Sequence, residues 1–524
     1  MASETDLSLN TLTIVKLQKI LRTHKLPTSG TKLVLIRRII DNIQNPSDVL
    51  SISTHRYKIK ELSDQKIREL LENDDYKVFK HNINNIIENN VNDIYLSAYG
   101  NLNNKIFNNM MYLLSKNTSI TSIHIYGFSL TEKSGALLAE VVMHRGIKML
   151  TIDSCKSDNK LVAQPWLKAF ANTLIENKTL LELDIGFCNL KDEHTKSELF
   201  NGLAGNTSIK SLSLSNNLIG DDFSCEKLLN NMLLKNKNIT SLVLNRNVTQ
   251  NGVIYFADGL SLNSTLEHLT FYNILTDADI GELIKSLDIN HSINSLRFMD
   301  NIDIGLWRSL IDVLSRKKMK SLAFPLMSLN YDYIKYLSDT FINADLNSLT
   351  LLNVGLSKKS VDYLSKTLLS HNTNIEHLNV SENNLGSDNI EILYSAIAIH
   401  KNIKTLNINY SDNIGGDTVV KMIKDNFIVN LNISQSSIHN GLLGIDVALS
   451  NNDVLTDLNM EASNVKEDDA QQILNGLQHN HALVDLNLNN NIMIPKYLMV
   501  NINNIVEKNR LTNRSLMYML IGEL

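Results

Sequence analysis

The stretch that decides the fold, residues 375–383, reads IEHLNVSEN. Leu378 and Val380 lie two positions apart, Ile375 precedes the pair by three positions, and Asn383 follows Leu378 by five. Apolar residues at alternate positions predict a short β-strand with one buried face. The asparagine comes where the strand should end, so its side chain can satisfy backbone groups at the turn.

The same spacing recurs over most of the chain. The first leucine-like residue of each pair falls at positions 94, 123, 150, 183, 212, 242, 269, 296, 322, 349, 378, 406, 431, 458 and 486. These fourteen steps span 392 residues, which gives a mean period of 28. The second half of each unit has helical spacing, as at Ile390, Leu393, Tyr394 and Ile397. Such units cannot bury an apolar face alone, so we expect them to stack into a solenoid.

This pattern resembles the leucine-rich repeat, and a length of 27–29 residues is similar to that of the ribonuclease-inhibitor class. The resemblance implies an α/β solenoid, a horseshoe of about 15 strand–helix repeats with a parallel concave sheet and outer helices. We expect the repeat array over residues 91–500, a helical N-terminal cap over 61–90 and a C-terminal cap over 501–524. Cys155 and Cys188 occupy the asparagine position, so we expect structural roles for both.

One step of the repeat, from position 150 to 183, is 33 residues long. The extra residues fall near 157–166, a stretch that contains Pro165 and Trp166. Two interpretations stay open: a tolerated loop insertion beside a core tryptophan, or a protruding loop that contacts a partner.

The N-terminal segment is basic, and no acidic residue lies between Asp6 and Asp41. Its seven cations are Lys16, Lys19, Arg22, Lys25, Lys32, Arg37 and Arg38. That window carries a charge of +7, while the rest of the chain carries −12. A short basic head on a mildly acidic body indicates two binding roles.

Residues 9–43 are expected to form a small all-α helix–loop–helix head. Thr13 can cap a first helix with apolar residues at 14, 17, 20 and 21, and Thr31 can cap a second with apolar residues at 33, 36, 39 and 40. Between them, residues 26–30 break the helical pattern. Residues 44–60 are expected to be a linker.

The loop LPTSGTK, residues 26–32, and the basic helix after it resemble the SAP domain, a small DNA-binding module. This resemblance implies binding to AT-rich duplex DNA, mainly through phosphate contacts. The implied DNA-binding residues are Lys16, Lys19, Thr28, Ser29, Gly30, Thr31, Lys32, Arg37 and Arg38. The second helix departs from the family, because apolar Val34 and Ile36 stand where a glutamate is usual. A head that docks on the repeat array therefore remains an alternative to a head that binds DNA.

Residues that flank the paired leucines should face away from the core, onto the concave sheet. Six acids and one arginine make this face mildly acidic, which argues against binding to nucleic-acid phosphates. A few aromatic, apolar and guanidinium side chains stand out, and these types are enriched in protein interfaces. The predicted protein-binding residues are Tyr126, Tyr272, Arg297, Met299, Pro325 and Leu352. The alternative is that they are scattered surface residues with no common role.

No catalytic motif is found in the sequence: it has no P-loop, GxSxG, HExxH or glycine-rich dinucleotide turn, and its histidines lack metal-ligand spacing. We therefore expect a protein that is not an enzyme, with no catalytic residues, metal, cofactor or small-molecule substrate. The acidic N-terminus and the lack of an apolar run of about 20 residues predict an intracellular protein with no membrane partner.

The leading hypothesis is a non-enzymatic scaffold that presents its repeat surface to a protein partner while the head tethers it to DNA. Such a protein would be nuclear or DNA-associated. The alternative is a purely protein-interacting scaffold, or a GTPase regulator or inhibitor without DNA binding, since the array also resembles those of ribonuclease inhibitors and Ran GTPase-activating proteins.

Overall fold

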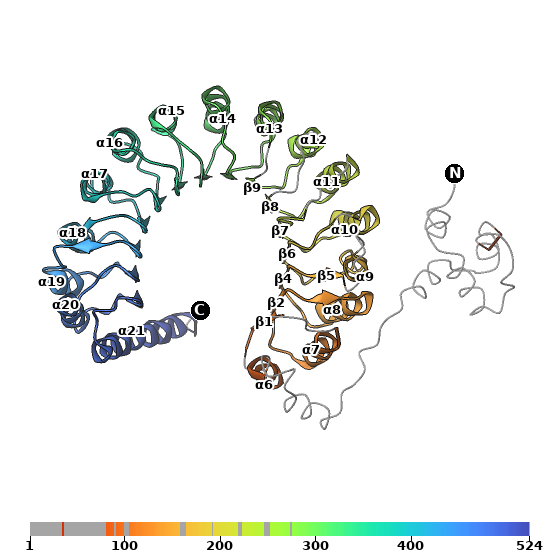
Figure 1. Ribbon diagram of the computed structural model, residues 1–524, viewed down its shortest axis with the longest axis horizontal. Coiled ribbons are helices and arrows are strands. Elements are labelled where there is room, and N and C mark those ends of the chain that lie inside the picture. Colours follow the sequence, from red (N-terminus) through yellow and green to blue (C-terminus); the bar gives the residue numbers. More distant parts are fainter. Residues whose placement is uncertain are drawn as a thin grey trace.

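The computed structural model describes residues 34–35, 80–88, 91–98, 104–157, 164–190, 192–217, 223–245, 252–272 and 275–522. Within these ranges, the side chains of residues 80–82, 156–157, 223–226 and 514–522 are not described. The repeats form an arc with strands on its inner side and helices on its outer side (Figure 1).

The inner layer is a parallel sheet of fifteen strands. They are β1 (Asp93–Ser97), β2 (Ser122–Tyr126), β4 (Met149–Asp153), β6 (Glu182–Gly186), β7 (Ser211–Ser213), β8 (Ser241–Asn245), β9 (His268–Tyr272), β10 (Ser295–Phe298), β11 (Ser321–Ala323), β12 (Ser348–Thr350), β13 (His377–Asn379), β14 (Thr405–Asn407), β16 (Asn430–Asn432), β18 (Asp457–Asn459) and β19 (Asp485–Asn487). Two small sheets pair β3 (Ser129–Leu130) with β5 (Lys156–Ser157) and β15 (Ile414–Gly415) with β17 (Ile438–His439). The fifteen strands fall on the fifteen predicted repeats, which confirms the leucine-rich repeat horseshoe.

The outer layer consists of helices that alternate with these strands. They are α6 (Lys80–Glu88), α7 (Asn104–Lys116), α8 (Glu132–His144), α9 (Pro165–Ala171), α10 (Glu193–Gly205), α11 (Phe223–Lys235), α12 (Val253–Leu262), α13 (Asp277–Ile289), α14 (Ile304–Arg316), α15 (Tyr331–Phe341), α16 (Lys358–Leu364) with its π-helical continuation η2 (Ser365–Leu369), α17 (Ser387–Ile397), α18 (Gly416–Lys424), α19 (Ile445–Ser450), α20 (Glu467–Leu477) and α21 (Lys496–Gly522). Helix α21 runs through residue 500, where the array was expected to end, so one helix serves the last repeat and extends beyond it.

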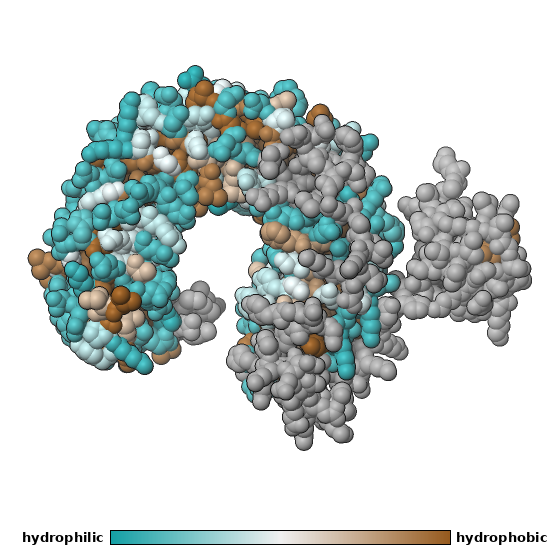
Figure 2. All heavy atoms as spheres, in the orientation of Figure 1, coloured by the Kyte–Doolittle hydropathy of each residue, from teal (hydrophilic) through white to brown (hydrophobic). Residues whose placement is uncertain are grey.

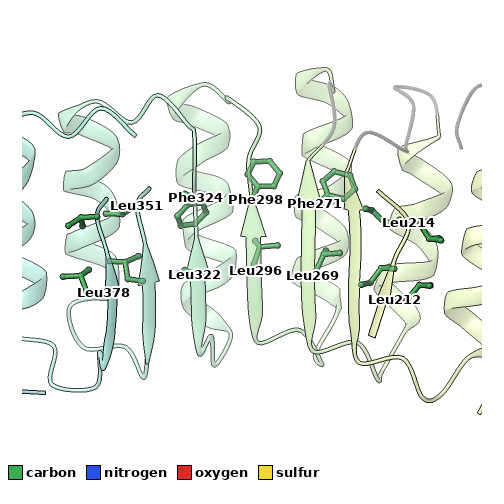
Figure 3. Close-up of a cluster of buried hydrophobic side chains, with 14 of the residues drawn as sticks. Leu212, Leu214, Leu269, Phe271, Leu296, Phe298, Leu322, Phe324, Leu351 and Leu378 are labelled. Atoms are coloured by element: carbon green, nitrogen blue, oxygen red, sulfur yellow. The ribbon is translucent and has the colours of Figure 1, made fainter. Parts of the chain in front are cut away.

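The paired leucines stack on one another between the two layers. In the register of the sheet, Leu296 lies between Leu269 and Leu322, and all three side chains are almost fully buried. Their side chains and those of the neighbouring phenylalanines point from the strands toward the helices (Figure 3). Burying each such side chain stabilises the fold by about 1.5–3 kcal/mol. The core is therefore one continuous ribbon that runs the length of the arc.

Where an asparagine follows the strand, as at Asn217, Asn383 and Asn491, its side chain links neighbouring repeats. Asn383 is buried, and its Nδ2 donates to the carbonyl oxygens of Leu351 at 2.7 Å and Val380 at 2.8 Å. Its Oδ1 accepts from the backbone N–H of Val354 at 2.9 Å. Cys188 takes the same position in its repeat and is fully buried.

A second row of buried asparagines, which the sequence analysis missed, lies in the loops that lead into the strands. Its members stand six positions before the first leucine of their repeats: Asn117, Asn177, Asn206, Asn236, Asn263, Asn290, Asn372, Asn452 and Asn480. Asn290 is typical, because its Nδ2 donates to the carbonyl oxygens of Leu260 and Asn263, each at 2.8 Å. Its Oδ1 accepts from the backbone N–H groups of Ser292 at 3.0 Å and Ile293 at 2.9 Å. Side-chain amides thus join neighbouring repeats at both ends of their strands.

Trp166, the tryptophan of the lengthened step, belongs to the core. Its side chain is fully buried in α9, and its indole Nε1–H donates to Oε1 of Gln164 at 2.9 Å. Residues 158–163 lie outside the described part of the chain, so the protruding-loop interpretation concerns residues of which the structure says nothing.

Cys155 and Cys188 are expected to resist alkylation in the folded protein. Burial raises the pKa of the Cys155 thiol to about 12 and moves the pKa of Cys188 in the same direction. Because the thiolate is the reactive form, both should react with iodoacetamide roughly a hundredfold more slowly in buffer than in concentrated guanidinium chloride. Peptide mass spectrometry measures each site separately, and equal rates in the two conditions would contradict the burial.

Candidate binding surface on the concave sheet

The concave surface is built from strand residues that alternate with the buried leucines. Its middle row, in strand order, reads Tyr95, His124, Thr151, Asp184, Ser213, Val243, Thr270, Arg297, Ala323, Thr350, Asn379, Asn407, Asn432, Asn459 and Asn487. The space-filling view shows an open hollow inside the arc (Figure 2). Three zones of this face differ in composition: an N-terminal zone on β1, β2, β4 and β6, a middle zone on β9–β12, and a C-terminal zone on β13, β14, β16, β18 and β19.

The N-terminal zone has an aromatic platform. The rings of Tyr95 and His124 stack with their centroids 4.3 Å apart and an interplanar angle of 6°, and Tyr95 is 57% exposed. Nδ1 of His124 lies 3.0 Å from Oγ1 of Thr151. Burial lowers the pKa of His124 despite the opposing charges of Asp93 and Asp184. The imidazole is therefore neutral at pH 7.

Carboxylates surround this platform. Burial is the main cause that raises the pKa of Asp184; a hydrogen bond from Ser213 lowers it, and the charge of Asp153 raises it further. Gly186 makes room for the Asp153 side chain, because a Cβ at this glycine would lie 2.7 Å from Oδ2 of Asp153. Together with Asp93, these acids form a negatively charged surface beside exposed aromatic rings.

The middle zone contains the one arginine of the concave strand positions. Arg297 is half-buried, and burial lowers the pKa of its guanidinium. Tyr272 and Met299 follow in the next row, and Leu352 lies two residues past the end of β12; each is partly exposed. These four of the predicted residues therefore lie on one stretch of the sheet.

Two predicted protein-binding residues do not belong to that stretch. Pro325 is buried, so the expectation that it exposes apolar surface is wrong: the chain turns at Leu326, whose φ is 60°, and Leu326 is exposed instead, at 57%. Tyr126 lies on β2, five strands from β9 in the sheet order. At the usual strand spacing this is a separation of about 24 Å, which places Tyr126 in the N-terminal zone.

The C-terminal zone is dominated by asparagines that serve their own turns. Oδ1 of Asn379, Asn432 and Asn459 each accepts from the backbone N–H two residues further on, at 3.0 Å in every case. A shallow hollow of about 250 Å³ lies over this zone, lined by asparagines, leucines, Asp457 and Asp485. The asparagines are explained by the backbone groups that they satisfy, so their number does not by itself indicate a ligand.

The predicted DNA-binding residues are not placed by the structure. Lys16, Lys19, Thr28, Ser29, Gly30, Thr31, Lys32, Arg37 and Arg38 all lie outside the described residues. Within the described ranges, no cluster of three or more His, Cys, Asp or Glu side chains could hold a metal ion. In the same part of the chain, no helix combines the length and apolar character needed to cross a bilayer.

Comparisons with known proteins give a family match for the N-terminal segment and a relative that contains leucine-rich repeats. Residues 8–44 match the SAP domain family. A curated relative is the NACHT, LRR and PYD domains-containing protein 4C of Mus musculus, 24% identical over 346 residues. The match covers 56% of this chain and 35% of that protein, so the chain spans about a third of the relative's length.

Two solved structures show weaker likenesses. One is the crystal structure of the Rad7 and Elc1 complex in yeast, with 15% identity, coverage of 89% of this chain and 95% of that chain, and a TM-score of 0.47. The other is the actin-binding site 2 of leiomodin-1, with 16% identity, coverage of 40% and 88%, and a TM-score of 0.21. Both TM-scores are below 0.5, so neither structure supports an inference about this chain.

Proposed function

We propose that this chain, a leucine-rich repeat protein with an N-terminal SAP domain, is a non-enzymatic scaffold that tethers a protein partner to DNA. The observation that carries the proposal is the presence, in one chain, of a SAP domain at residues 8–44 and an open concave sheet with a mixed polar and apolar middle zone. A DNA-associated or nuclear location follows from the same proposal.

The DNA-binding half of the proposal rests on the head. Between Asp6 and Asp41 the head has seven cations and no acidic residue, whereas the concave strands contain several acidic residues. Lysines and arginines release counterions from duplex DNA, so the head and not the sheet should supply the affinity. Thr28, Ser29 and Lys32 of the loop are the proposed phosphate contacts, which would position the head without reading base sequence.

The protein-binding half rests on the middle zone. Within the described residues, no ion pair is made by Arg297, although its guanidinium is half-buried. A partly desolvated charge gains most from a partner that supplies a carboxylate or carbonyl group. Tyr272 and Met299 add the aromatic and flexible apolar surface found at interface hot spots.

Selection of binding peptides tests this half. A random library of 16-residue peptides is panned against the full chain, and the selected peptides are titrated against variants. Arg297→Ala and Tyr272→Ala should each weaken binding about tenfold or more, as at hot spots. Arg316→Ala is the matched control, because Arg316 lies on the outer helix α14 and is exposed. Unchanged binding to both concave variants would contradict the proposed site.

A further inference from the structure

We propose that the N-terminal zone of the concave face binds a cationic segment of the protein partner, with a lysine or arginine side chain lying over the aromatic rings and against the carboxylates. The zone is defined by Tyr95, His124, Tyr126, Asp153 and Asp184. The inference rests on the proposed function, because it specifies the chemistry of the partner that the concave face would hold.

The carboxylates of this zone are not paired with a cation in the described part of the chain. Among the described residues, no ion pair involves Asp93, Asp153, Glu182 or Asp184. His124 does not supply the missing charge, because burial lowers its pKa. Asp184 is desolvated and repelled by Asp153, which raises its pKa. A cation brought by a partner would offset the cost of burial and of repulsion, because an opposite charge nearby favours the ionised carboxylate.

The aromatic rings provide the second part of the site. Tyr95 is exposed and its ring stacks on that of His124. Tyr126 lies on the same face, two residues after His124. Lysine and arginine cations are attracted to ring faces at distances up to about 6 Å. Carboxylates alone would attract any cation, but flat rings beside them favour a side chain with an apolar stem.

The dimensions fit a short peptide segment. Strands β1, β2, β4 and β6 are consecutive in the sheet, which makes the zone about 14 Å across. An extended segment of roughly four residues covers that distance. Gly186 lies on β6 at the border of the zone, and a Cβ there would lie 2.7 Å from Oδ2 of the neighbouring Asp153. The absence of a side chain at Gly186 leaves space for the Asp153 carboxylate.

The composition of the selected peptides gives the first test. Peptides selected on the full chain should be enriched in lysine and arginine relative to the input library. Their affinity should fall about tenfold in the double variant Asp153→Asn/Asp184→Asn and in Tyr126→Ala, and it should weaken further as salt is raised. The matched control is Asp457→Asn/Asp485→Asn, which removes the same charge from the C-terminal zone of the same face and should leave binding unchanged.

Stability gives a second readout, which separates binding from misfolding. The folded state raises the pKa of Asp184, so stability falls as the pH rises from the ordinary aspartate pKa to the raised one, and the full loss is present above that raised pKa. Asp184→Asn should therefore unfold at a higher denaturant concentration than the parent at pH 7, with the difference vanishing at low pH. A variant that is more stable and yet binds the peptides less tightly cannot be explained by loss of structure.

The outcomes distinguish this inference from the proposed function. Peptides without lysine or arginine enrichment, or binding that survives Asp153→Asn/Asp184→Asn but not Arg297→Ala, would overturn the cationic site and leave the scaffold function standing. If no selected peptide depends on either zone, both the site and the concave-face function are wrong.

Discussion

Gly135→Ala is expected to destabilise the first repeats by about 4 kcal/mol, although alanine is the better helix former. Gly135 lies in α8, where a Cβ would stand 1.9 Å from the carbonyl oxygen of Trp166 and 2.5 Å from its carbonyl carbon. Both contacts are with backbone, which cannot rotate away as a side chain can. Helices α8 and α9 must separate to admit the methyl group, and this exposes the buried face of Trp166.

Hydrogen exchange measured by mass spectrometry reports this effect locally. Amides in α8 and α9 should exchange much faster in Gly135→Ala, while those of α20 should not change. Gly281→Ala is the control, because Gly281 also lies within a helix, α13, and a Cβ there meets nothing within 4 Å. That variant should be neutral or slightly stabilising. If both variants behaved alike, the close approach of α8 and α9 would be refuted.

Asn290→Ala is expected to cost about 3 kcal/mol, more than most polar substitutions. The change deletes two hydrogen bonds donated to backbone carbonyls and two accepted from backbone N–H groups, together with a 3.4 Å contact from Oγ of Ser292. The carbonyl oxygens of Leu260 and Asn263 lose the amide donor that they share. An unsatisfied buried polar group costs about 1–3 kcal/mol, and Asn290 is fully buried. The cost arises between repeats, because the bonds join the loop of one repeat to the preceding one.

Equilibrium denaturation, followed by circular dichroism, measures this loss. Asn475→Ala is the matched control, since Asn475 is exposed on α20 and its side chain accepts a hydrogen bond from Gln471 one turn earlier. We expect that control to change stability by less than about 0.5 kcal/mol. A similarly small change for Asn290→Ala would show that water replaces the lost bonds.

The fold could be predicted in detail because the same pattern of apolar residues occurs in fifteen successive repeats. Each strand is set by the same pair of apolar residues, and Leu378 or Leu406 alone would have been ambiguous. The row of asparagines that includes Asn290 was missed, although its spacing of six residues before the leucine is present in the sequence. Its role depends on carbonyl groups of the preceding repeat, which no single repeat reveals.

The site was predictable only in part. Alternation along the strands correctly placed Arg297 and Tyr272 on the concave side, because side-chain direction follows from the register. The burial of Pro325 could not be predicted from alternation, because Leu352 holds the same position in the next repeat and is partly exposed. Of the acids and rings around Asp184, the sequence analysis singled out Tyr126 alone. Their grouping appears only when the strands are placed side by side in the sheet.

The central claim is that the head tethers this scaffold to DNA, and fluorescence anisotropy with an AT-rich duplex tests it most directly. Titrations at several salt concentrations compare the full chain, a truncation beginning at Ser51, and a full-length variant with Lys16, Lys19, Arg37 and Arg38 changed to glutamine. The control neutralises four exposed lysines of the array instead: Lys285, Lys320, Lys358 and Lys366.

The account predicts that the full chain and the array control bind with a salt slope of several charges. The truncation should not bind, and the head variant should bind weakly with a slope reduced by about three to four. If the full chain fails to bind at low salt, or if the truncation binds equally well, the head is not a DNA tether and the protein is a scaffold for protein partners alone.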